Sequence, residues 1–275
     1  MWISERGSSD RVLTGVAALL AAAFVLAPAP LAAIRPDGGF AGQGQLAGAL
    51  RAAFAEFWRS GGQSFSPSLT SVVDYWLRYH LVKAVTAALL FAVLAVLGAR
   101  LWKAFTRGAG LGAGRRAALA SAGVAVTALA LFSLALVMAN VQGSVTPFAS
   151  LLPMLLDGPG GGESTATLDQ VRQRLADGGQ ASPALQVMID DFARYHVAMA
   201  VIAGVVAAGI TALSVLLWRR FAATARTERR TRRVLASFGV VTALLPLVAG
   251  LIAVANTTTA LDPAPALLAF FEGGW

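Results

Sequence analysis

The sequence predicts an all-α membrane protein with five transmembrane helices. Three observations lead to this fold class: the composition, five long apolar segments, and a repeat of the chain at a fixed offset. Of the 275 residues, 57% are hydrophobic and 13% are charged, whereas soluble domains have about 25% charged residues. This composition is typical of a membrane protein. The chain has no cysteine, which excludes disulfides and thiolate metal sites.

Five apolar segments are long enough to cross a bilayer, which takes about 20 residues in a helix. They cover residues 12–33, 81–102, 118–140, 197–218 and 234–256. The first segment also resembles a secretory signal peptide, because small residues and prolines follow its apolar run. Its apolar run continues to Ile34, however, and the charges before it cancel. We therefore expect residues 1–44 to form an uncleaved transmembrane or signal-anchor segment.

The basic residues between these segments predict the orientation of the chain. Residues 100–116 carry five basic and no acidic residues, and residues 219–233 carry seven basic residues and Glu228. Residues 141–196 carry more acidic than basic residues. Short basic loops stay in the cytoplasm, so we expect a multi-pass plasma-membrane protein with a cytoplasmic N-terminus and an extracytoplasmic C-terminus. The basic loop 219–233 could also bind anionic lipid or nucleic acid, although we read it as a topology determinant and expect no nucleic acid partner.

The second half of the chain repeats the first half at an offset of 116 residues. The triplet Arg78-Tyr79-His80 returns as Arg194-Tyr195-His196, and the match extends without a gap from residue 66 to residue 152. Internal repeats of this kind indicate a duplicated structural unit. The predicted units are residues 45–158 and 163–275, two membrane hairpins related by a pseudo-two-fold axis along the membrane normal.

Each predicted unit begins outside the membrane. A serine-proline pair, Ser66-Pro67 or Ser182-Pro183, predicts the start of a helix that runs into the bilayer without a break. Upstream of each pair, apolar residues share one helical face and predict an extracytoplasmic amphipathic helix. These residues are Leu46, Leu50, Phe54 and Phe57 in one unit, and Leu168, Val171 and Leu175 in the other. The i,i+4 spacing also predicts two exposed ion pairs, Asp74–Arg78 and Asp190–Arg194.

The candidate site is a polar rim formed by His80, His196, Asn140 and Asn256. Each histidine begins a descending span at the depth where an asparagine ends an ascending one, and alanines follow each histidine on its helical face. Such small residues mark close helix contacts in membranes. We expect each histidine to hydrogen-bond across its own hairpin and fix the helix register. A metal or haem site shared by the two histidines and a pH-sensitive rim are the alternatives.

Three stretches carry a resemblance to a known group of proteins. The ending LDPAPALLAFFEGGW, the inner-interface motif LLWRRF and the duplicated R-Y-H resemble small integral membrane proteins of actinobacteria, over residues 66–275. The resemblance implies a membrane location and no particular activity, cofactor or site residue.

The sequence contains no recognised catalytic motif, so no catalytic residue is assigned and an enzyme is not favoured. We predict a non-enzymatic scaffold or accessory component of the cell envelope, without a cofactor. Its expected partners are the lipid bilayer and either a membrane protein or a second copy of the chain. The alternatives are a small transporter or channel built from the duplicated hairpin, and a haem- or metal-binding redox protein that uses His80 and His196.

Overall fold

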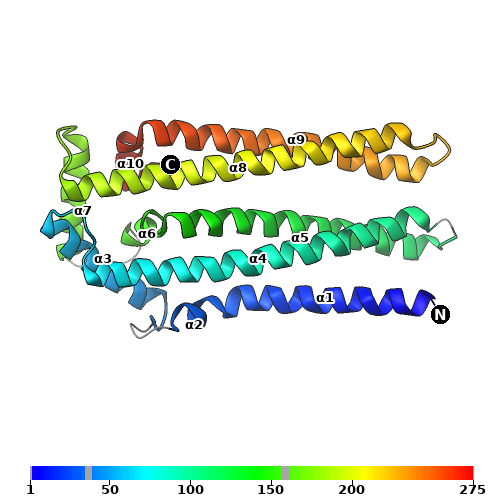
Figure 1. The fold of residues 1–275 in the computed structure, drawn as a ribbon, viewed down its shortest axis with the longest axis horizontal. Coiled ribbons are helices and arrows are strands. Elements are labelled where there is room, and N and C mark those ends of the chain that lie inside the picture. Colours follow the sequence, from blue (N-terminus) through cyan, green and yellow to red (C-terminus); the bar gives the residue numbers. More distant parts are fainter. Residues whose placement is uncertain (1, 35–38, 109, 157–161, 275) are drawn as a thin grey trace. The chain divides into compact units, whose positions relative to one another are not determined.

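The computed structural model describes residues 2–34, 39–108, 110–156 and 162–274. Within these ranges the chain forms helices and no strand (Figure 1). Five of the helices are long and apolar enough to cross a membrane. They are α1 (Trp2–Leu26), α4 (Pro67–Arg107), α5 (Ala113–Val145), α8 (Pro183–Ala223) and α9 (Arg229–Leu261). The predicted all-α class and the five long apolar helices are therefore confirmed.

Five shorter helices complete the described chain. They are α2 (Pro28–Ala32), α3 (Gln43–Ser60), α6 (Pro147–Leu156), α7 (Gly162–Ala176) and α10 (Pro263–Phe271). Helices α2, α4, α6, α8 and α10 all begin at a proline, because the first helical position needs no N–H donor and suits the fixed φ of proline. The predicted starts of α4 and α8 are confirmed. The hydroxyls of Ser66 and Ser182 accept hydrogen bonds from the third helical N–H group, each at 3.4 Å.

The first apolar segment differs from its prediction. Residues 12–33 were expected to form one helix, but α1 ends at Leu26 and α2 begins at Pro28. Proline has no N–H to donate, and its ring clashes with the carbonyl group four residues earlier in a continuing helix. Proline interrupts the helix but is not strongly polar, so the apolar pattern continues through this position. The hydropathy of the segment therefore does not show where the helix ends.

The chain forms two compact units, and neither is contiguous in sequence. The span unit comprises residues 1–26, 83–139 and 202–252, and the core unit comprises residues 27–82, 140–201 and 253–275. Each unit takes segments from both halves of the sequence, so these units differ from the predicted repeat units 45–158 and 163–275. The repeat units were defined by sequence similarity and not by contacts, so they stay a prediction.

Two antiparallel hairpins make up most of the span unit. In the α4–α5 hairpin, the indole of Trp102 lies against Gly123, where an added Cβ would come within 2.9 Å of the ring. Trp102 Nε1 also donates to Thr127 Oγ1 at 3.1 Å. The α8–α9 hairpin repeats the packing with Trp218 against Gly239, again with 2.9 Å between an added Cβ and the ring. Glycine at these two positions lets the helix backbone approach the indole.

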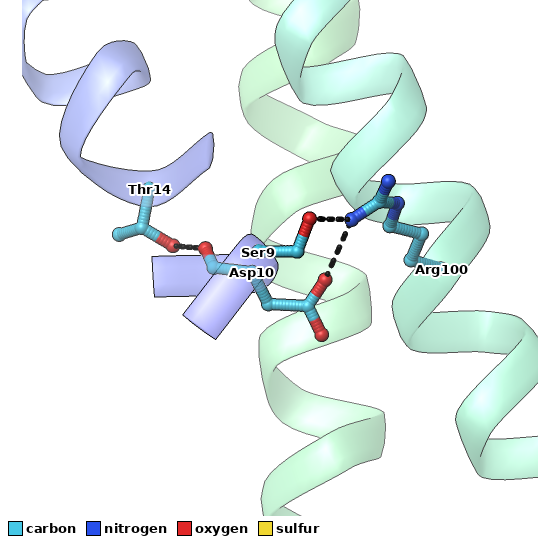
Figure 2. A network of polar contacts seen from close by, with 4 residues as sticks. All are labelled: Ser9, Asp10, Thr14 and Arg100. Carbon is cyan, nitrogen blue, oxygen red and sulfur yellow. Dashed lines mark hydrogen bonds and ion pairs between the residues drawn. The ribbon is translucent and has the colours of Figure 1, made fainter. Parts of the chain in front are cut away.

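Helix α1 lies antiparallel to α4 within the span unit. Figure 2 shows Arg100 of α4, whose Nη1 donates to Ser9 Oγ at 3.1 Å and pairs with Asp10 Oδ1 at 3.3 Å. Near the other end of α1, Lys83 Nζ lies 4.6 Å from the ring centroid of Phe24. Residue numbers thus rise along α1 as they fall along α4. The exposed Asp10–Arg100 pair contributes only about 0–1 kcal/mol, so it orients the helix more than it stabilises it.

The core unit contains the main hydrophobic core, built from α3, α6, α7, α10 and the first turns of α4 and α8. The predicted amphipathic faces are confirmed as buried faces: Leu50 and Phe57 of α3 and Val171 of α7 are fully buried, and Leu175 is partly buried. Contacts join α3 to α6 and α7, and α7 to α10. Burial of each large apolar side chain contributes about 1.5–3 kcal/mol, so hydrophobic burial holds the short helices of this unit together.

Candidate functional site

All four residues of the predicted polar rim lie in the core unit, and the structure brings His196 and Asn256 together. His196 Nδ1 of α8 lies 2.8 Å from Asn256 Oδ1 of α9. Because a carbonyl oxygen only accepts, Nδ1 carries the proton and donates. The ring of Phe192, one turn earlier, packs edge-on against the imidazole with centroids 4.6 Å apart. The expected hydrogen bond across the hairpin is therefore present between α8 and α9.

His80 meets the neighbouring helix of its hairpin in a different way. Its Nδ1 donates to the carbonyl oxygen of Trp76, one turn earlier in α4, at 3.1 Å. The Cδ2–Nε2 edge of the ring lies against Gly143 of α5, and a Cβ at that position would overlap the imidazole. His80 thus contacts α5 through a close approach of its ring to the helix backbone.

Asn140 lies on the same side of α5 as this contact. It is buried, with 6% of its surface exposed, and it precedes Gly143 by three residues, which places the two on one helical face. The carbonyl oxygen of Asn140 accepts a hydrogen bond from Ser144 Oγ at 2.6 Å. In the other hairpin the position equivalent to Gly143 holds Thr259.

Two polar contacts that sequence reasoning missed join the halves of the chain. Gln142 Nε2 of α5 donates to the carbonyl oxygen of Tyr195 in α8 at 3.0 Å. Asp191 Oδ2 of α8 accepts from the N–H group of Ala149, in the first turn of α6, at 2.9 Å. The equivalent residues in the repeat are Thr258 and Tyr75. A comparison of the two copies could have indicated these contacts, because Gln142 and Asp191 each differ from the equivalent residue in the other copy.

The predicted ion pairs on α4 and α8 are wrong. Arg78 Nε donates instead to the carbonyl oxygen of Ala32 at 2.9 Å, which ties α4 to α2 within the core unit. Asp190 accepts from Gln186 Nε2 at 2.8 Å. An ion pair on a helix surface contributes only about 0.2–0.5 kcal/mol. A hydrogen bond to a nearby neutral carbonyl or amide group is therefore able to compete with it.

The rim offers few ligands for a metal ion or a haem group. Among the described residues, no three or more side chains of His, Cys, Asp or Glu gather in one group. With Nδ1 protonated, each neutral imidazole keeps its lone pair on Nε2, and in His80 this edge faces the backbone of α5. Each imidazole contacts the facing helix of its own hairpin, at Asn256 for His196 and at Gly143 for His80.

Comparisons of the chain with protein-family models, with curated proteins and with solved structures found no match.

Proposed function

We propose that this protein is a non-enzymatic scaffold or accessory component of the cell envelope, anchored by five transmembrane helices. One observation carries the proposal: α4 and α8 each continue unbroken for 41 residues. Both helices begin in the core unit and end in the span unit. At the helical rise each is about 60 Å long, roughly twice the hydrocarbon thickness of a bilayer. Two continuous helices of this length suit a folded platform supported from the membrane.

The proposed topology is a cytoplasmic N-terminus, cytoplasmic basic loops and an extracytoplasmic core unit at the plasma membrane. The positive-inside rule supports it through residues 100–116 and 219–233. The contact of Asp10 with Arg100 adds support, since it brings the beginning of α1 to the end of α4 that leads into the first basic loop. Both segments then lie on the same side of the membrane.

We also propose that the two hairpins arose by duplication, with a pseudo-two-fold axis along the membrane normal. The bounds of α8 and α9 are those of α4 and α5 displaced by 116 residues at both ends, and α6 and α10 begin 116 residues apart. The repeated packing of Trp102 on Gly123 and of Trp218 on Gly239 supports the same origin. Parallel repeats of this kind keep both hairpins in one orientation.

A scaffold contacts its partner through a defined surface, which site-specific photocrosslinking in cells can locate. Ala52 of α3 and Gln173 of α7 are exposed positions of the core unit, and Leu213 of α8, with 47% of its surface exposed, is a matched position in the span unit. A photoreactive residue at position 52 or 173 should crosslink to one discrete protein partner or to a second copy of the chain. Position 213 should crosslink mainly to lipid.

The alternative functions give opposite results with the purified protein. Proteoliposomes containing a transporter or channel would show solute flux that depends on the protein, and a bis-histidine haem protein would show a Soret band. Either result, together with uniform crosslinking at positions 52, 173 and 213, would contradict the scaffold proposal.

A further inference from the structure

A cavity of about 620 Å³ lies in the span unit beside the two basic loops. Its walls come from the end of α4, the first turns of α5 and the first turns of α9. The charged residues that line it are Arg116, Glu228, Arg229, Arg230 and Arg233, and the ring of Phe105 forms part of an apolar wall. Four guanidinium groups against one carboxylate give the cavity a positive potential.

The start of α9 adds to this potential. The cavity walls include Thr227 to Thr231, which cover the first turn of α9. Backbone N–H groups of a first helical turn have no partner within the helix, and the helix dipole makes this end positive. Anions bind at such ends. Four arginines and a helix N-terminus therefore converge on one hollow.

Arg116 differs from its repeat equivalent in a way that points to a ligand. The equivalent residue, Arg232, donates from Nη1 to the carbonyl oxygens of Phe221 at 3.0 Å and Thr224 at 2.8 Å, and lies over the Phe221 ring. These contacts satisfy the end of α8. In the described part of the chain, Nε of Arg116 is buried and has no hydrogen-bond partner. A buried donor without a partner is unfavourable, and other atoms of the same side chain line the cavity.

The aromatic contacts differ in the same manner. Arg230, rather than Arg116, lies over the Phe105 ring, 5.8 Å from its centroid. Arg116 thus lines the cavity, and its Nε is buried without a hydrogen-bond partner among the described residues. The positive-inside rule explains why these loops are basic, but it does not require them to form a cavity lined by four arginines.

We propose that this cavity binds a phosphate group, supplied by an anionic phospholipid headgroup or by a soluble phosphate compound. Phosphate matches the arginines, because guanidinium groups donate paired hydrogen bonds to phosphate oxygens. It would accept hydrogen bonds from the guanidinium groups that line the cavity and neutralise the charges of Arg116, Arg229, Arg230 and Arg233. Basic pockets between transmembrane helices are a known form of lipid headgroup site.

The test compares Arg116→Gln with Arg115→Gln in the full-length protein, purified in detergent. Both variants remove one positive charge from adjacent residues of α5, but Arg115 is exposed and does not line the cavity. Affinity is measured in mixed micelles containing phosphatidylglycerol or phosphatidylcholine, and separately with inorganic phosphate. Loss of a charge-assisted hydrogen bond should weaken binding of the anionic ligand by about tenfold in Arg116→Gln. Arg115→Gln should change it by less than about twofold.

The two ligand arms distinguish the source of the phosphate. Binding of phosphatidylglycerol that depends on Arg116, without binding of inorganic phosphate, supports a lipid headgroup. Binding of inorganic phosphate that depends on Arg116 supports a soluble compound. Equal losses in the two variants, or no binding of either probe above that of phosphatidylcholine, would overturn the proposal.

A second variant keeps the test decisive if Arg116→Gln fails to fold. Glu228→Gln removes the carboxylate that lines the cavity, so an anionic ligand should bind about two- to fivefold more tightly. A purely structural role of the cavity predicts no such gain. Unchanged or weaker binding in Glu228→Gln would overturn the proposal independently of Arg116.

Discussion

The two histidines occupy equivalent positions in the repeat, and each contacts the facing helix of its own hairpin. His196 donates to Asn256 across its hairpin, whereas His80 presses the edge of its ring against Gly143. Thr259 stands at the position equivalent to Gly143. The two histidines of the identical R-Y-H triplets have different partners at Nδ1, which are the carbonyl oxygen of Trp76 for His80 and Asn256 Oδ1 for His196.

The first prediction concerns the close approach at Gly143. Gly143→Ala should lower the free energy of unfolding by about 1–3 kcal/mol, because the new methyl group overlaps the His80 ring and forces a shift of packed helices. Gly204→Ala is the matched control, since a Cβ at Gly204 of α8 meets nothing within 4 Å. Alanine should leave stability there unchanged or raise it by about 0.4–1 kcal/mol. Equal effects of the two substitutions in thermal unfolding in detergent would contradict the packing assigned to His80.

A double-mutant cycle tests the hydrogen bond between His196 and Asn256. The variants His196→Ala, Asn256→Ala and their combination should give a coupling energy of about 0.6–1.7 kcal/mol, the range found for hydrogen bonds between transmembrane helices. Unfolding in detergent supplies the measurement. Strictly additive effects of the two single variants would mean that the bond does not hold this hairpin together.

The paired variant His80→Ala with His196→Ala should weaken both hairpins without changing the topology. Each substitution removes a ring that packs against the facing helix. An unchanged unfolding temperature in detergent would show that neither histidine fixes helix register.

At the scale of the elements, each hairpin is held at its other end by an indole packed on a glycine. Trp102 on Gly123 and Trp218 on Gly239 have similar geometry, and Trp102 Nε1 also donates to Thr127 Oγ1 at 3.1 Å. Trp102 further packs edge-on against Phe238, with centroids 5.1 Å apart. This ring contact joins the two hairpins within the span unit.

The repeated glycine contact gives a prediction at this scale. Gly123→Ala and Gly239→Ala should each lower the free energy of unfolding by about 1–3 kcal/mol, because the methyl group displaces a large and rigid indole ring. The two losses should be similar. Gly250→Ala in α9 is the control, since a Cβ there meets nothing within 4 Å. A loss in Gly250→Ala as large as the other two would assign the effect to the helix backbone and not to the indole.

The sequence predicted the elements well where one local rule decided the outcome. Apolar length identified the five long helices, and the serine-proline pairs located the starts of α4 and α8. The break at Pro28 was missed because hydropathy averaged over a window does not register the lost N–H group. The hydrogen bond between His196 and Asn256 was predicted, but the contacts of Gln142 and Asp191 were not, because they depend on how the two halves of the sequence pack. The basic cavity was not predicted either. Counting charges in the loops does not show that they form a cavity or that Arg116 Nε lacks an acceptor in the described part of the chain.

At the scale of the whole molecule, the chain combines two units of different character. The core unit buries a cluster of phenylalanine and leucine side chains, as a water-soluble domain does. The helices of the span unit leave many large apolar side chains exposed, for example Leu19, Val205 and Leu251, as expected of surfaces that face lipid. This contrast supports a membrane-anchored platform, and the proposed topology requires the core unit and the basic loops to lie on opposite sides of the bilayer.

Single-cysteine labelling tests that requirement most directly, because the chain contains no cysteine of its own. Gln173→Cys in α7 and Ala225→Cys in the second basic loop both place a thiol at an exposed position. In intact cells, a membrane-impermeant maleimide should label Cys at position 173 and should label position 225 only after permeabilisation. Labelling of position 225 in intact cells, with position 173 protected until permeabilisation, would contradict the proposed topology and the extracytoplasmic scaffold that depends on it.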